Sequence, residues 1–403
     1  MRIIKAEVAY LYSAHFVRFG FVFVLLPIIA RRLGLDELGI FLFVQSLCMI
    51  MTQFVEFGYA LSGTRDVVNA KDDSFARSLI LSNALAAQAS IFTVILALVL
   101  VPLSYKVGLL TSFVFLLHAG LSGMSIGWFF RAMQKSVLVA KVEIFGKSVT
   151  LIFIFLLVQS SGDLFFVGLS LLLGSALSLG ISIYLIRDTF RYDLISVGAI
   201  NETCKRSWDS FLVRAGGSTL SDGNVFICGM ILSPLEFSFF ASAYRISSGV
   251  RGLFGPLVDA LLPRIVIEMV DSERQRVFVG KLVPLLVGLG VLFSLGLFVF
   301  ASEIMHLVLA STGERPVNLL QVLALLPLIM AFVHLFGTCH LVSWGESKLY
   351  SRIVLGSGLF GMLMCLIMVN IFGSFGAIGA ILLSYVLVAL ASYRRVWSLK
   401  DYA

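Results

Sequence analysis

The stretch LGIFLFVQSLCMIMTQFVEFGYALSGTRDVVNAKDD, residues 38–73, contains the two features that decide the fold of this chain. Its first part, residues 38–60, is an apolar run, and about 20 such residues span the hydrocarbon core of a bilayer. Its second part turns polar and carries Arg65, Asp66 and Lys71. The stretch therefore predicts a membrane helix followed by a water-exposed loop.

The composition extends this prediction to the whole chain. Of its 403 residues, 59% are hydrophobic and 13% are charged, whereas a soluble domain carries about 25% charged residues. So few charges cannot cover a water-facing surface, so we expect an all-α integral membrane protein embedded in the lipid bilayer. The net charge of +7 is explained by Lys and Arg in cytoplasmic loops, and no nucleic-acid partner is expected.

Apolar runs separated by polar breaks predict twelve transmembrane helices. Their ranges are 9–30, 38–60, 77–101, 108–129, 143–159, 163–186, 209–232, 236–261, 278–301, 317–343, 350–371 and 374–396. If both termini are cytoplasmic, most basic residues between the spans fall inside the cell. The outside segments then hold only Arg31, Arg32, Lys106 and Arg315, as the positive-inside rule requires. The longest loop, 187–208, is too short for a soluble catalytic domain.

The helix pattern repeats at an offset of about 200 residues, and three pairs of segments match in the same order. The pairs are 33–47 with 232–246, 132–148 with 343–359, and 160–177 with 370–387. They predict two six-helix bundles, 1–190 and 209–403, joined by a cytoplasmic linker, 191–208, and related by pseudo-two-fold symmetry. Substrate lies between such halves in many transporters. The alternative is that membrane helices of unrelated origin simply resemble one another.

Four arginines fall inside predicted spans, where each costs about 2.5–3.5 kcal/mol at the helix centre. With a histidine on the same helix face as the first of them, they form the candidate substrate-binding set: Arg18, Arg214, Arg245, Arg251 and His15. Arginine presents a fork of donors that suits phosphate, so an anionic ligand is predicted. The alternatives are internal ion pairing, such as Arg214 with Asp222, and snorkelling toward the helix ends.

Acidic residues near the same helices are candidates for gating or coupling. These are Glu56, Asp222 and Asp259, together with Arg65 and Asp66 of the polar loop. Because the buried cations outnumber these acids, we expect a positively biased cavity. The alternative for the loop is a solvated connector whose charges only set the topology.

Sequence motifs for nucleotide or metal chemistry are lacking. Gly146-Lys147-Ser148 resembles the end of a Walker A loop, but Lys141 stands where that motif needs glycine. The five cysteines form no metal-ligand spacing. We therefore expect no cofactor, no metal and no catalytic residue.

Two segments resemble the polysaccharide flippase family (Wzx type) of the multidrug/oligosaccharidyl-lipid/polysaccharide (MOP) exporter superfamily. The first combines Gly58-Tyr59 with Gly63-Thr64-Arg65-Asp66 after the second helix. The second is Trp128-Phe129-Phe130, with Arg131 and Lys135, after the fourth helix. The resemblance implies a MATE-like fold of two bundles around a central cationic cavity.

The resemblance also implies a function, which is to flip undecaprenyl-pyrophosphate-linked oligosaccharide units, such as O-antigen units, across the bacterial inner membrane. Its implied partners are the lipid-linked oligosaccharide and the polymerase and chain-length regulator of the same pathway. Three alternatives remain: a drug or metabolite exporter of the same fold, a membrane polysaccharide polymerase, and a structural scaffold. An exporter of cationic drugs favours acids in mid-helix, a polymerase needs a large periplasmic loop, and a scaffold needs no buried arginine.

Overall fold

The computed structural model describes residues 20–400 apart from 72, 256, 259–260, 262–264, 266–271 and 311–312. Within these residues every regular element is helical and no strand occurs. The all-α prediction is therefore confirmed. By their contacts the residues group into two compact units, Val44–Ser218 and Met1–Phe43 with Thr219–Ala403.

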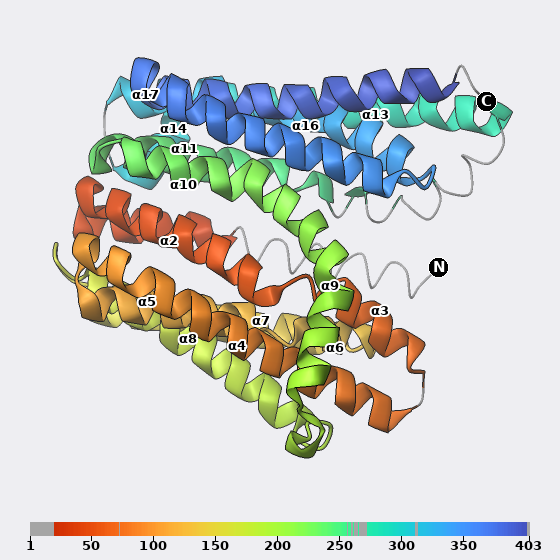
Figure 1. Cartoon of the computed structure of the whole chain (residues 1–403). Helices are drawn as coiled ribbons and strands as arrows, with labels where there is room; N and C mark the ends of the chain where they lie inside the picture. The colour runs from red at the N-terminus through yellow and green to blue at the C-terminus, as the bar shows by residue number, and fades with distance from the viewer. Residues whose placement is uncertain are drawn as a thin grey trace. The chain divides into compact units, whose positions relative to one another are not determined.

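The unit of residues 44–218 contains most of α2 and seven further helices (Figure 1). They are α2 (Leu35–Glu56), α3 (Ser62–Asn69), α4 (Ser74–Val107), α5 (Leu109–Gly123), α6 (Gly127–Ala132), α7 (Ser136–Leu157), α8 (Leu164–Ile186) and α9 (Val197–Ser218), with the short 3-10 turn η1 (Tyr192–Leu194) before α9. Helix α8 packs against both α5 and α7, and α4 packs against α5 and α9. The long apolar helices thus form a bundle of their own.

The other unit contains a helical segment at residues 20–33, the first turns of α2 and the helices that follow Ser218. They are η2 (Thr219–Gly223), α10 (Asn224–Ile231), α11 (Pro234–Arg251), α13 (Ser272–Val299), α14 (Ala301–Leu309), α15 (Glu314–Leu323), α16 (Leu325–Val333), η3 (His334–Val342) and α17 (Ser347–Lys400). Both η2 and η3 are π-helical and pack against α17.

Local signals in the sequence explain where several helices begin and end. Asp73 caps α4 by accepting a hydrogen bond from the Ala76 backbone N–H, and Ser233 caps α11 ahead of Pro234. Gly373, with φ 57° and ψ −135°, interrupts α17. This break divides α17 into the two helices predicted at 350–371 and 374–396. Just before α8, hydrogen bonds from the Gln159 and Ser160 backbone N–H groups lower the pKa of Asp163.

The outer surface of the helices is apolar, as a bilayer requires. Leu98, Leu110 and Leu292 are 69%, 71% and 62% exposed, and such surface in water would favour aggregation. Among the described residues, seven helices are long and apolar enough to cross a membrane. The chain is therefore a multi-pass membrane protein. Every predicted span overlaps a described helix, while the count of twelve crossings stays a prediction.

Two segments of the proposed repeat meet in space. Gly39 of α2 lies so close to the Pro234 carbonyl of α11 that a β-carbon would overlap it. These residues lie in the matching segments 33–47 and 232–246, so the two segments touch. The division into bundles 1–190 and 209–403 with a linker at 191–208 stays a prediction.

Candidate functional site

Three residues of the predicted site, Arg18, His15 and Asp259, lie outside the described residues. The other members fall into two groups. Asp222, Arg245 and Arg251 belong to the unit that follows Ser218, and Glu56 and Arg214 belong to the unit of residues 44–218.

Arg251, the last residue of α11, meets an aromatic partner on α17. Its Nη1 donates a hydrogen bond to the Tyr385 hydroxyl, and its guanidinium carbon lies 5.1 Å from the centroid of the Tyr385 ring. The tyrosine is 3% exposed, whereas the arginine is half-buried. A rigid ring and hydroxyl therefore hold the guanidinium while part of it stays accessible.

Asp222 adds one negative charge beside two arginines. It lies in the π-helical turn η2, accepts a 3.4 Å hydrogen bond from the Ser221 hydroxyl and interacts electrostatically with Arg251 and Arg245. All three charged side chains are half-buried. The Asp222 carboxylate therefore lies in the field of both guanidinium groups.

The histidines of the helices differ in their surroundings. His118 hydrogen-bonds Ser175 at 3.1 Å and His340 bonds the Leu335 carbonyl at 2.7 Å. His334, the first residue of η3, stacks on Phe254 with 6.0 Å between ring centroids and interacts electrostatically with Arg251. Within the described residues its Nδ1 makes no hydrogen bond. His334 therefore adds a polar group to the surroundings of Arg251.

Sequence patterns missed the two π-helical turns and Tyr385. A π-helix has the same residue types as an α-helix and often marks a functional site, but no hydrophobic period reveals it. Tyr385 reads as one more aromatic residue in an apolar run, and only its contact with Arg251 distinguishes it.

Arg214 forms an ion pair with Glu56, 2.8 Å between Nη2 and Oε2. The side chains are 33% and 15% exposed, so the pair is neither open to water nor fully desolvated. Internal ion pairing, considered above as an alternative to ligand binding, therefore applies to Arg214, but with Glu56 as partner. The pair ties the end of α2 to α9.

We expect the Glu56–Arg214 pair to contribute a measurable coupling. Exposed ion pairs contribute about 0–1 kcal/mol to stability, and breaking a buried pair costs about 3–5 kcal/mol. Because this pair is intermediate in exposure, we expect a coupling energy of about 1–2 kcal/mol between the two side chains. The variants Glu56→Gln, Arg214→Gln and their combination form a double-mutant cycle, read as melting temperatures of purified protein. Purely additive shifts would show that the two side chains are not coupled.

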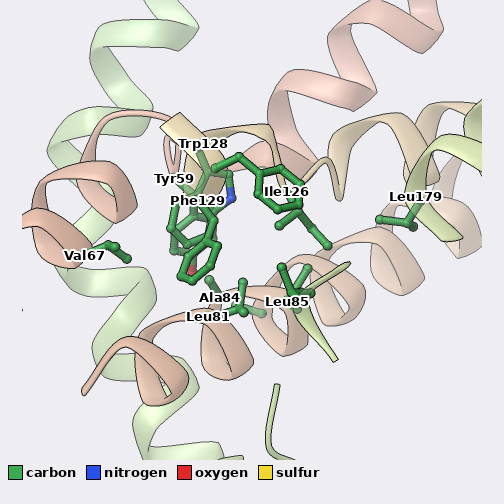
Figure 2. Close-up of a cluster of buried hydrophobic side chains, with 12 residues drawn as sticks. Tyr59, Val67, Leu81, Ala84, Leu85, Ile126, Trp128, Phe129 and Leu179 are labelled. Atoms are coloured by element: carbon green, nitrogen blue, oxygen red, sulfur yellow. The ribbon is translucent and has the colours of Figure 1, made fainter. Parts of the chain in front are cut away.

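The two segments that carry the family resemblance touch each other. The Thr64 hydroxyl donates to the Trp128 carbonyl at 3.3 Å, and a β-carbon on Gly63 would lie 2.8 Å from the Trp128 ring. Figure 2 shows Trp128 beside Tyr59 in a buried cluster that also contains Phe129. The two segments thus make a packed joint between α3 and α6.

Arg65 and Asp66 belong to helix α3 in the structure, where the sequence predicted a water-exposed loop. Arg65 Nε lies 3.4 Å from Asp66 Oδ1, and the side chains are 62% and 28% exposed. Gly63 and Thr64 therefore pack against Trp128, while the neighbouring Arg65 and Asp66 carry the more exposed charges. A gating role for Arg65 and Asp66 stays a prediction.

Charged side chains held among the apolar helices of a multi-pass chain mark a functional site in the membrane. The chain belongs to the polysaccharide biosynthesis protein family, whose model matches residues 4–269.

Two bacterial relatives extend over most of the chain. A putative O-antigen transporter of Shigella dysenteriae is 25% identical over 399 residues, covering 97% of this chain and all of the relative. A putative O-antigen transporter of Escherichia coli K12 is 24% identical over 362 residues, covering 87% and 86% of the two chains.

Solved transporters share the fold. The lipid II flippase MurJ in an inward closed conformation matches with a TM-score of 0.75 and 12% identity, covering 98% of this chain and 87% of that one. An inward-facing MATE transporter of the MOP superfamily matches with a TM-score of 0.72 and 13% identity, covering 94% and 98%. The predicted MATE/MOP-like fold is therefore confirmed.

Proposed function

We propose that the protein is a flippase for lipid-linked polysaccharide units. Membership of the polysaccharide biosynthesis family and two relatives described as putative O-antigen transporters support this proposal. The specific substrate we propose is an undecaprenyl-pyrophosphate-linked oligosaccharide, moved from the cytoplasmic to the periplasmic leaflet of the bacterial inner membrane. Both chain termini would then be cytoplasmic.

The observation that carries the proposal is Arg251, whose guanidinium is held by Tyr385 and stays partly accessible. Keeping a guanidinium group among apolar helices is costly, and an anionic ligand would offset part of this cost. A diphosphate offers two charged groups whose oxygens accept hydrogen bonds. The guanidinium group of arginine can donate two parallel N–H bonds to such oxygens. Arg18, Arg214 and His15 remain proposed members of the same binding set, and Glu56, Asp222, Asp259, Arg65 and Asp66 remain proposed gating or coupling groups.

The proposed mechanism is alternating access, in which the two halves rock around the bound diphosphate. Because the sequence carries no Walker A loop, we propose that an ion gradient, the membrane potential or the substrate gradient drives the cycle. The polymerase and chain-length regulator of the pathway are proposed partners that receive the flipped unit.

An enzymatic role has less support. Gly123-Met124-Ser125-Ile126-Gly127 matches the Gly-X-Ser-X-Gly pattern of hydrolases, but that motif works at a strand-to-helix turn. Here the segment joins α5 to α6. The relatives are also described as transporters, which favours transport over catalysis.

Deleting the gene in its host tests the proposal. We expect loss of surface polysaccharide and accumulation of lipid-linked units on the cytoplasmic side, both restored by the wild-type gene. Single unpolymerised units at the cell surface would instead identify a polymerase. Normal polysaccharide with increased drug sensitivity would identify a drug exporter, and either result would overturn the flippase proposal.

A further inference from the structure

A small cavity lies where α9 packs against the turn that follows α2. Its volume is about 280 Å³, and Phe57, Cys204, Lys205 and Trp208 line it. All four residues belong to the unit of residues 44–218. The cavity is of a size for one ring rather than for a whole drug-sized ligand, which needs about 300–1,000 Å³.

Two of the lining residues, Phe57 and Trp208, belong to a cluster of aromatic rings. The rings of Phe57 and Phe211 stack with centroids 4.8 Å apart and planes inclined by 12°. Trp208 lies 6.1 Å from Phe57 and 5.5 Å from Phe211. We call Phe57, Trp208 and Phe211 the aromatic platform. Trp208 is 50% exposed, so part of its ring stays accessible beside Phe57.

The backbone under the platform is held in an unusual conformation. Phe57 has φ 48°, a left-handed conformation that costs a non-glycine residue about 1–2 kcal/mol. It persists because Gly58 packs directly on the Ser210 and Phe211 backbone. Backbone strain of this kind clusters at functional sites. Here the strained residue is Phe57, whose ring lies beside Trp208.

Charged residues flank Trp208 along α9. Lys205, Arg206 and Asp209 are exposed on the same turns of α9 as Trp208. Arg206 pairs with Glu202 at 3.1 Å, whereas Lys205 has no ion-pair partner within the described residues. The exposed ammonium group of Lys205, with three donors, is therefore available beside Trp208.

We propose that the aromatic platform and Lys205 form a sugar-binding subsite for the oligosaccharide of the lipid-linked unit. This inference rests on the proposed flippase function. A pyranose ring has an apolar C–H face and a rim of hydroxyl groups, so its face packs on Trp208 and Phe57 while Lys205 donates to its oxygens. A phospholipid headgroup would use the cation but gain nothing from the stacked rings.

Binding to two probes tests the subsite. One probe is undecaprenyl diphosphate carrying the host's own oligosaccharide, extracted from the deletion strain, and the other is bare undecaprenyl diphosphate. We expect Trp208→Ala to weaken binding of the first about tenfold and to leave binding of the second unchanged, with Trp208→Phe in between. Trp397→Ala is the matched control, because Trp397 is 54% exposed on α17.

Three results would overturn the subsite. Equal loss of both probes, or unchanged binding of both, would make Trp208 a membrane-interface residue or a packing residue. Trp208→Ala can also lower the melting temperature by removing packing. Trp208→Phe keeps a ring in place, so weaker oligosaccharide binding at an unchanged melting temperature in that variant reports recognition alone. Wild-type protein that binds neither probe would contradict the proposed function as well, so failure of the two proposals can be told apart.

Discussion

Replacing Arg251 with alanine is expected to reduce surface polysaccharide to the level of the gene deletion, with protein still present in the membrane. The guanidinium group is held by the Tyr385 hydroxyl and ring and stays partly accessible, so it can contact the proposed anionic ligand. Losing one charge-assisted contact to a buried anion costs several kcal/mol, and each 1.4 kcal/mol is a factor of ten. Complementation of the deletion strain, with protein level measured in parallel, provides the readout.

Three companion variants sharpen this test. Arg251→Lys keeps the charge but loses the fork and should recover only part of the polysaccharide. Tyr385→Phe keeps the ring but removes the hydroxyl acceptor, so an intermediate loss is expected. Arg352→Ala removes an exposed arginine of α17 and should behave as wild type. Normal polysaccharide with Arg251→Ala would remove Arg251 from the proposed substrate-binding set.

Replacing Gly58 with alanine should produce the largest loss of stability among the variants considered. Gly58 has φ +76°, and a β-carbon there would lie 2.5 Å from the Phe211 backbone nitrogen. The left-handed conformation alone costs alanine about 1–2 kcal/mol, and the backbone overlap would push α9 away from the turn. We expect a melting temperature at least several degrees lower, and little purified protein.

Gly180→Ala is the matched control for Gly58→Ala. Gly180 lies in α8 with nothing within 4 Å of its β-carbon position, and alanine is the better helix former by about 1 kcal/mol. Its melting temperature should stay unchanged or rise. Equal melting temperatures for Gly58→Ala and the wild type would show that α9 does not pack against this turn as closely as described.

Part of the candidate site was predictable from the sequence, because charges inside apolar runs are conspicuous. Arg245, Arg251 and Asp222 were found in this way, and the structure brings them together in one unit. The aromatic platform was not found. Phe57, Trp208 and Phe211 are ordinary apolar residues in sequence, and only the left-handed turn at Phe57 and Gly58 places Phe57 beside the rings of α9.

The sequence by itself determined that this is a helical membrane protein, because the length of an apolar run is a local property that decides whether a segment can cross the bilayer. Only the tertiary structure decided which polar groups meet. Glu56 pairs with Arg214 across 158 residues of chain, and Arg251 meets Tyr385 across 134. Such meetings depend on the rotation and packing of whole helices, which many distant contacts set together and no single segment encodes.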